Sequence, residues 1–248
     1  MSGEDLIETK NLHFEDREVV CLIKRNRRAR RISLRINSSN QVILNVPGRG
    51  SIAEAKNFLL SRSDWIRQKT ADMPSQVELS EFLKRKPRVF LDNHSRNVLF
   101  DFSESRKKNI YQITTDSIEV IFPDSKDRET SILSFMLELA RIYLPARFEK
   151  CAQKVGISYK KVRVGNQKSR WGSCSSKRVI SLNWRILLLD YEIGEYVLYH
   201  ELAHLQHMNH SFRYWNLLDE WLPGAKNIDR KLSSAGRELM LLGRTKGG

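Results

Sequence analysis

The chain has no run of eighteen apolar residues, and its first residues, MSGED, are polar and acidic. A membrane-spanning helix needs about 20 mostly apolar residues. A secretory signal has a basic start that is followed by an apolar stretch. The sequence predicts neither feature, so we expect a soluble protein that stays in the cytoplasm and has no membrane partner.

Cysteine is scarce, because only Cys21, Cys151 and Cys174 occur in the sequence. They are odd in number and widely separated, and they form no C-x-x-C pair of the kind found in structural zinc sites or redox couples. Reduced thiols in a reducing compartment are the simplest interpretation. For Cys174 we predict a small buried residue and not a nucleophile, since no histidine lies beside it in the sequence.

Acidic residues are outnumbered: 43 Lys and Arg face 29 Asp and Glu, which gives a net charge of +14 at pH 7. Such a field attracts polyanions in a salt-dependent way. A nucleic-acid partner bound through this basic surface and an unspecific basic surface are both open interpretations. The Arg-rich run at residues 24–31 indicates a solvated turn or a phosphate-contacting patch. It contains no aromatic residue, which argues against base stacking there.

The periodicity of apolar residues predicts an α+β fold. Alternating residues over 18–47 predict strands, and the turn residues at 37–40 predict a hairpin between the second and third of them. Ser51 begins a helix by the capping logic, and further strand candidates follow up to about residue 122. The pattern is helical from about 128 to 155. We therefore expect an N-terminal, mostly β region with short helices over residues 1–124, and a second domain over 125–248.

Four of the six histidines lie within residues 200–210. His200 and His204 are one helical turn apart, so their side chains leave the same face of a helix. With Glu201 they form H-E-x-x-H, the pattern in which two neutral imidazoles bind zinc and the glutamate acts as general base on a zinc-bound water. Apolar residues upstream predict that a helix over about 193–207 carries this motif.

A zinc hydrolase has three protein ligands and one open position. We choose His210 as the third ligand, because the offsets 0, +4 and +10 are those of H-E-x-x-H-x-x-G-x-x-H. His210 can reach the metal only if the helix ends before it. Asn209 tolerates the left-handed conformation that commonly ends a helix. Glu220 is the second candidate and His207 the third, since on a continuous helix His207 lies about 10 Å along the axis from His200.

Several segments of the sequence resemble the YgjP-like metallopeptidases, which are relatives of the SprT-like zinc proteases. The segments that carry this resemblance are HELAHL at 200–205, NHS at 209–211 with Trp215, SRWGSCS at 169–175, ISLNWR at 180–185, and the N-terminal Arg-rich strand region with Val46-Pro47. The resemblance implies a zincin-like helical/β metallopeptidase domain at 125–248. It also implies Zn²⁺ as cofactor, His200, His204 and His210 as metal ligands, and Glu201 as the base.

We therefore expect a zinc-dependent metallopeptidase that hydrolyses the peptide bonds of a protein or peptide substrate, with a zinc-activated water and Glu201 as general base. Two alternatives stay open. One is a nucleic-acid-binding protein whose zinc site is structural. The other is a protease recruited or stimulated by DNA, which fits the positive charge equally well.

Two expectations concern the substrate. In zinc proteases of the resembled type, a strand before the metal-bearing helix commonly pairs with an extended substrate, and the positional match is residues 180–183. A buried core strand is the alternative for this segment. A donor should also stabilise the oxyanion, and the candidates are Tyr199, Tyr214 and Arg170.

Overall fold

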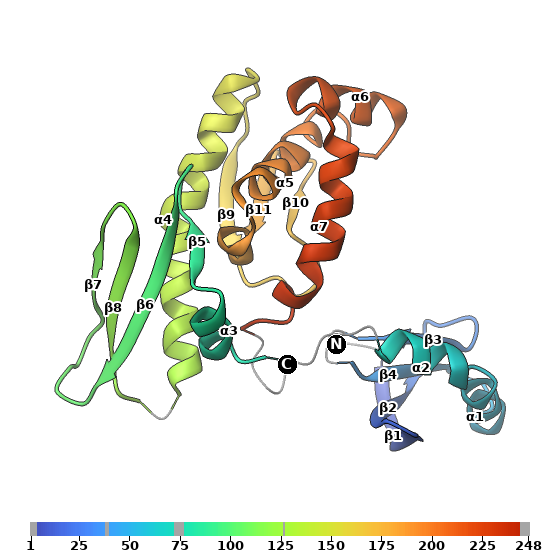
Figure 1. The fold of residues 1–248 in the computed structure, drawn as a ribbon. Helices are drawn as coiled ribbons and strands as arrows, with labels where there is room; N and C mark the ends of the chain where they lie inside the picture. Colours follow the sequence, from blue (N-terminus) through green and yellow to red (C-terminus); the bar gives the residue numbers. More distant parts are fainter. Residues whose placement is uncertain (1–3, 38–39, 72–76, 126, 244–248) are drawn as a thin grey trace. The chain divides into compact units, whose positions relative to one another are not determined.

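The computed structural model describes residues 4–37, 40–71, 77–125 and 127–243, which fall into two compact units, Met1–Gln76 and Val77–Gly248 (Figure 1). These residues form seven α-helices and three mixed sheets, which confirms the predicted α+β class. No described helix is both long and apolar enough to cross a membrane. The described cysteines are free, and Cys21 and Cys151 are buried whereas Cys174 is half-buried.

The first unit is a four-stranded sheet with two helices. Its strand order is β1-β2-β4-β3, in which β2 and β4 are parallel and the other pairs antiparallel. The antiparallel β3–β4 pair is the predicted hairpin, and α1 begins after Ser51, whose side chain accepts a hydrogen bond from the amide of Glu54 at 3.3 Å. The elements are β1 (Glu4–Phe14), β2 (Arg17–Asn26), β3 (Ser33–Ile36), β4 (Val42–Pro47), α1 (Ile52–Leu60) and α2 (Ser63–Ala71).

The Arg-rich run at 24–31 forms the end of β2 and the turn that follows it. Arg25 Nη1 donates to the carbonyls of Pro47, Gly48 and Gly50 at 3.2, 2.8 and 3.2 Å, so this side chain holds the loop after β4. The arginines at 27, 28, 30 and 31 are exposed. Arg25 therefore has a structural role, whereas the exposure of the other four arginines is expected of both a solvated turn and a phosphate-contacting patch.

The second unit begins with a helix and a four-stranded sheet that pack on the long helix α4. The elements are α3 (Leu79–Arg85), β5 (Arg88–Phe90), β6 (Ser95–Ser103), β7 (Ile110–Ile113), β8 (Ser117–Pro123) and α4 (Arg128–Lys154), with strand order β5-β6-β8-β7. The carboxylate of Glu129 on α4 accepts the amides of Leu79 and Ser80 at 2.7 and 3.1 Å, which caps the first turn of α3. Pro145 does not divide α4.

The domain boundary expected after residue 124 lies inside this second unit, between β8 and α4. Phe122 on β8 and Phe135 on α4 are both buried, and their rings pack edge to face with centroids 5.6 Å apart. The sheet and the helix on the two sides of residue 124 therefore share one apolar core.

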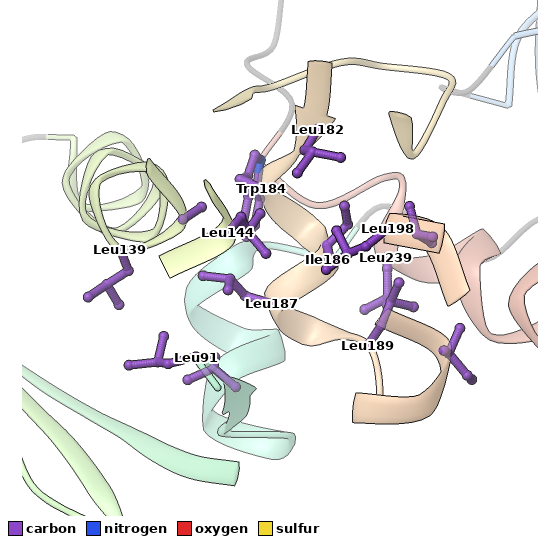
Figure 2. Packing of buried hydrophobic residues seen from close by; sticks show 14 of the residues in the cluster. Leu91, Leu139, Leu144, Leu182, Trp184, Ile186, Leu187, Leu189, Leu198 and Leu239 are labelled. Atoms are coloured by element: carbon purple, nitrogen blue, oxygen red, sulfur yellow. The ribbon is translucent and has the colours of Figure 1, made fainter. Parts of the chain in front are cut away.

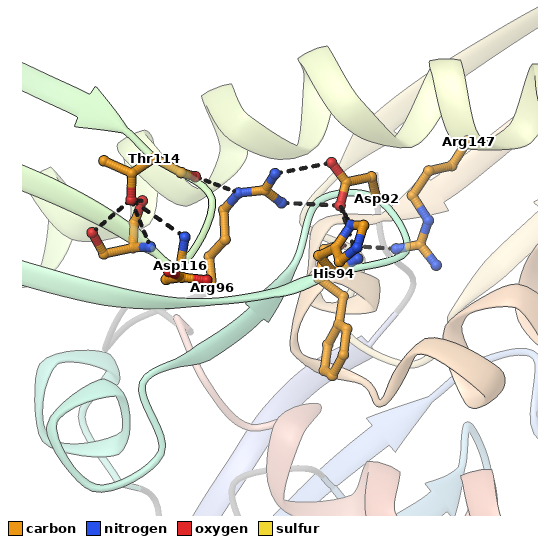
Figure 3. Close-up of polar contacts among 8 residues, drawn as sticks. Asp92, His94, Arg96, Thr114, Asp116 and Arg147 are labelled. Carbon is orange, nitrogen blue, oxygen red and sulfur yellow. Dashed lines mark hydrogen bonds and ion pairs between the residues drawn. The ribbon is translucent and has the colours of Figure 1, made fainter.

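An ion pair closes the turn between β5 and β6 (Figure 3). Arg96 donates from Nη1 and Nη2 to the two carboxylate oxygens of Asp92, each at 3.0 Å, and from Nε to the carbonyl of Thr114 at 2.9 Å. The hydrogen bonds from Arg96 lower the pKa of Asp92 to about 2. The turn is thereby tied to the segment that leads into β8.

The rest of the second unit is a three-stranded sheet followed by helices. The elements are β9 (Lys161–Gly165), β10 (Gly172–Cys174), β11 (Val179–Asn183), the 3₁₀ helix η1 (Trp184–Leu188), α5 (Tyr191–Ala203), α6 (Phe212–Trp221) and α7 (Ala225–Leu239). The strand order is β10-β11-β9. Figure 2 shows Leu144 of α4 beside Trp184 and Leu187 of η1, within the core that also contains Leu198 of α5 and Leu239 of α7.

Replacing Asp92 with Asn should lower the free energy of unfolding at pH 7 by roughly 1–2 kcal/mol, a value reduced for the 35% exposure of the Asp92 side chain. The folded pKa is depressed, so this stabilisation is complete above the unfolded value of about 3.9 and is lost as the pH falls toward about 2. Denaturant unfolding across pH 2–8 measures it. Glu192→Gln, which removes an exposed ion pair with Lys231, is the control and should change stability by less than about 0.5 kcal/mol. If the free energy of unfolding depends on pH in the same way in Asp92→Asn and in the parent, the ion pair of Asp92 with Arg96 does not contribute this stability.

Candidate metal centre

The histidine motif lies at the end of α5, where the helix stops and the chain turns back. α5 ends at Ala203 with His204 as its cap, so it ends earlier than the predicted residue 207. The amides of Leu205, Gln206 and His207 donate to the carbonyls of Leu202 or Ala203 and close a tight turn. Asn40 and Arg178 are the non-glycine residues with positive φ in the described ranges, so the left-handed residue expected at Asn209 is not used.

This turn brings together the three histidines chosen from the sequence. His200 Nε2 lies 3.2 Å from His204 Nε2 and 3.2 Å from His210 Nε2, and the three ligand atoms all lie within 4.8 Å of one another. Within the part of the chain that the structure describes, this is the one group of three or more His, Cys, Asp or Glu side chains that is close enough to share a metal ion. Glu220 is exposed on α6 and lies outside the group.

His207 contributes its backbone and not its ring. His204 Nδ1 donates to the carbonyl of His207 at 3.1 Å. That bond places the proton of His204 on Nδ1 and leaves the lone pair of its Nε2 directed toward the other histidines. Proximity in the sequence therefore predicted a contact for His207, but the contact uses its main chain.

Burial disfavours the protonated forms of His200 and His204. Burial, and then the charges of His204 and His210, lower the pKa of His200 to about 3. Burial also lowers the pKa of His204. Because a metal binds only the unprotonated imidazole nitrogen, this donor set fits a divalent metal ion that accepts nitrogen ligands.

Glu201 is buried beside the histidines, with 4% of its surface exposed, and its Oε2 has no hydrogen-bond partner among the described residues. Burial raises the pKa of Glu201 to about 8, whereas the charge of Arg170 lowers it. A cation bound by the histidines would lower the pKa further, in the same direction as Arg170. The carboxylate of Glu201 is thus shielded from water, and its Oε2 accepts no hydrogen bond from the described residues.

Gly172 on β10 leaves the room for this carboxylate. A Cβ atom at residue 172 would lie 2.6 Å from Cδ of Glu201, which is closer than real Cβ contacts. Only glycine therefore lets the strand pass this close to Glu201. Gly172 lies in the segment SRWGSCS, which carries the family resemblance, but the sequence predicted no role for it. The one feature of the sequence that could have indicated this role is that Gly172 is the single glycine in the segment.

Two tyrosines, Tyr196 and Tyr214, make hydrogen-bond contacts with His200. Tyr196 is fully buried, and its hydroxyl lies 3.3 Å from His200 Nδ1 and donates to Asp229 Oδ1 at 2.8 Å. Tyr214 donates to the carbonyl of His200 at 3.3 Å. Tyr196 lies four residues before His200, so helical spacing puts the two side chains on one face of α5, although Tyr196 was not among the predicted site residues. Nothing in the sequence indicated Asp229.

The structure separates the three oxyanion candidates. Tyr214 is fully buried with its hydroxyl bonded to the main chain of α5, and Tyr199 is buried beside Cys151. Neither hydroxyl is available to a substrate in this conformation. Arg170 is exposed, and its charge acts on Glu201. The sequence alone had left the three equivalent.

The strand at 180–183 is not a free edge. β11 pairs with β10 on one side and with β9 on the other, and Ile180, Leu182 and Asn183 are fully buried. The alternative of a core strand is therefore correct, because both sets of backbone groups are already bonded. β10 and β9 are the two edge strands of this sheet.

Asn183 and Arg185 position the loop before β10. Asn183 Nδ2 donates to the carbonyls of Gln167 and Arg170, each at 2.9 Å. Arg185 is fully buried and donates to the carbonyls of Gln167 and Leu242. The segments ISLNWR and SRWGSCS are therefore joined by hydrogen bonds, and together they set the position of Gly172 over Glu201.

Two solved structures show similarity to part of the chain. The metallopeptidase zymogen of Pyrococcus abyssi, abylysin, is 31% identical, with 36% of this chain and 92% of that chain covered and a TM-score of 0.33. The metallopeptidase zymogen of Methanocaldococcus jannaschii, jannalysin, is 21% identical, with 36% and 91% covered and a TM-score of 0.33. No curated protein matches the chain.

The two solved structures cover only 36% of the chain, so they do not assign it to a family, whereas a family model does. The model described as YgjP-like, metallopeptidase domain, matches residues 30–235, which is well over half of the chain. This match takes in the strands β3 and β4 as well as the histidine motif. The protein therefore belongs to the YgjP-like metallopeptidase family, and it is a metallopeptidase that hydrolyses peptide bonds.

Proposed function

We propose that this metallopeptidase binds zinc through His200, His204 and His210 and uses Glu201 as its general base. The observation that carries the proposal is the convergence of three imidazole nitrogens beside a buried, unpaired carboxylate. Zinc–nitrogen bonds of about 2.0–2.1 Å at tetrahedral angles put two ligand nitrogens about 3.3 Å apart. Two of the three pairs of Nε2 atoms are separated by 3.2 Å.

The number of ligands favours a catalytic site over a structural one. Structural zinc sites are closed by four protein ligands, whereas catalytic sites have three and an open position. The described residues bring three together, and Glu201 lies next to them without a hydrogen-bond partner on Oε2. The interpretation as a nucleic-acid-binding protein with structural zinc is therefore disfavoured, and the net charge alone does not support a nucleic-acid partner.

Zinc bound at this site supplies a Lewis acid that polarises the scissile carbonyl and acidifies a water molecule. Glu201 accepts a proton on the buried carboxylate that packs against Gly172, and it delivers that proton to the leaving amine. Burial raises the proton affinity of Glu201. Arg170 is our choice for the donor to the oxyanion, because its side chain is exposed and its charge acts at Glu201.

The substrate that we propose is an extended segment of a protein or peptide, which pairs with the edge strand β10 (Gly172–Cys174). An edge strand presents unpaired backbone groups to an added strand, and the recognition is then largely independent of the substrate's sequence. Gly172 on the same strand lies against Glu201, so a segment bound there passes beside the base. The three free cysteines support a reducing compartment, and we propose the cytoplasm.

Replacing Glu201 with Gln should leave zinc binding intact and lower turnover by at least about 100-fold, because the amide keeps the shape of the side chain but cannot accept the proton. Digestion of an unfolded protein and metal content per chain, measured on the same preparations, test this. A Glu201→Gln enzyme with zinc and with activity within tenfold of the parent would show that another group is the base.

The third ligand is tested by a pair of alanine variants. His210→Ala should retain little zinc after dialysis, because two imidazoles hold the ion weakly. His207→Ala should retain its zinc, because His207 contributes its carbonyl to the site and not its ring. Metal content by atomic emission distinguishes them. Loss of zinc from His207→Ala alone would move the ligand to His207.

Replacing Gly172 with Ala should reduce turnover by about 100-fold while zinc remains bound, because the added methyl group displaces the flexible end of Glu201. Gly165→Ala, on β9 of the same sheet, is the matched control, since a Cβ atom there meets its nearest neighbour at 3.5 Å. We expect near-parental kcat in this control. Equal kcat in both variants would show that Glu201 does not act from its position under β10.

A further inference from the structure

His200 is the central histidine of the site, because its Nε2 lies 3.2 Å from the Nε2 atoms of both other histidines. A ring nitrogen that binds a metal must carry no proton, so the proton of a neutral imidazole must be on the other nitrogen. For His200 this means a proton on Nδ1, which needs an acceptor in the protein. The hydroxyl of Tyr196 lies 3.3 Å from that atom.

The hydrogen bonds around Tyr196 define where its proton goes. A tyrosine hydroxyl has one proton to donate, and a carboxylate only accepts. Tyr196 donates to Asp229 Oδ1 at 2.8 Å, so its oxygen is left to accept. The partner within reach of its lone pair is Nδ1 of His200, which therefore carries the proton. The arrangement Asp229···H–O–Tyr196···H–Nδ1–His200 leaves the lone pair of His200 Nε2 facing His204 and His210.

The surroundings make this arrangement strong. Tyr196 is fully buried, and hydrogen bonds away from water are stronger than exposed ones. Tyr196 is on α5, one turn before His200, whereas Asp229 is on α7. Two helices that are separate in the sequence thus meet at the back of one imidazole.

His204 provides a contrast within the same site. Its Nδ1 donates to the backbone carbonyl of His207, a contact that no side-chain substitution removes. The corresponding contact of His200 is made by side chains alone. The orientation of His200 can therefore be changed by substituting Tyr196 or Asp229, while the histidines and Glu201 are left unchanged.

We propose that Tyr196 and Asp229 are positioning residues of the metal site. Asp229 orients the hydroxyl of Tyr196, and that hydroxyl holds His200 as the Nδ1–H tautomer and strengthens its bond to the metal. This inference rests on the proposed function, in which His200 is a zinc ligand. It assigns to α7 a role in metal affinity although α7 contributes no ligand.

A second tyrosine–carboxylate pair on α5 is the matched control. Tyr191 donates to Glu195 Oε1 at 2.6 Å, at the start of the helix and without contact to the three histidines. Tyr191→Phe removes the same atom from the same kind of bond. It reports what the loss of one such hydroxyl does to the stability of α5 in general.

The test compares Tyr196→Phe, Asp229→Asn and Tyr191→Phe with the parent protein. Zinc affinity is measured by competition with a chromophoric chelator, and the unfolding of each metal-free protein is measured separately. We expect zinc binding about 10–100-fold weaker in Tyr196→Phe and Asp229→Asn, and unchanged within about twofold in Tyr191→Phe. Asp229→Asn leaves the buried ring of Tyr196 in place and serves if Tyr196→Phe does not fold.

An independent readout is the ¹⁵N spectrum of the histidine ring nitrogens in the metal-free proteins. The parent should show His200 with its proton on Nδ1, and Tyr196→Phe should lose that preference. Zinc affinity within threefold of the parent in both variants, or a parent His200 with its proton on Nε2, would overturn the inference and leave the histidine site standing. If the folded parent binds no zinc, the proposed function fails, and the inference fails with it.

Discussion

The end of α5 is the constraint on which the site depends. The helix stops at Ala203, and three amides close the next turn on the carbonyls of its last residues. In a continued helix a residue six positions after His204 would lie about 9 Å further along the axis. The turn instead returns the chain, so that His210 Nε2 lies 3.2 Å from His200 Nε2. The same turn presents the carbonyl of His207 to His204 Nδ1. One backbone feature therefore positions two of the three histidines.

Close packing around α5 holds the remaining parts of the site. A Cβ atom at Gly172 would lie 2.6 Å from Cδ of Glu201, and one at Gly236 would lie 2.7 Å from Cζ2 of Trp171. Trp171 and Gly172 are adjacent, so the start of β10 contacts both α5 and α7. The side chain of Asn183 holds the loop before β10 by donating to two carbonyls of that loop, those of Gln167 and Arg170. Glu201, the proposed base, and the strand β10 are held by such contacts at a fixed separation without a bound substrate, which is what a preorganised site requires.

The second unit also contains several buried ionisable side chains, and they differ in their hydrogen-bond partners. Arg185 is fully buried, but it donates to backbone carbonyls and to Asn183. Arg147 donates to the carbonyl of Phe90 (Figure 3), and its guanidinium lies over the ring of Tyr191 at 5.1 Å from the centroid. Its Nε and Nη2 have no hydrogen-bond partner among the described residues, and burial lowers its pKa. Glu201 lacks a partner on Oε2. Unpaired buried charge destabilises a fold. For Glu201 the proposed chemistry accounts for that cost, since a base must have an acceptor atom that is free.

The sequence by itself determined the features that depend on local geometry. His200 and His204 share a helical face because the helix repeats every 3.6 residues, and the cap at Ser51 and the β3–β4 hairpin follow from neighbouring residues. The motif with His210 also predicted the group of three histidines that lie together. Only the tertiary structure decided that β11 is central and β10 an edge, that the hydroxyl of Tyr214 bonds to the main chain, and that Asp229 reaches Tyr196. These features depend on which distant segments pack against one another, and the periodicity of a single chain contains no information about that choice.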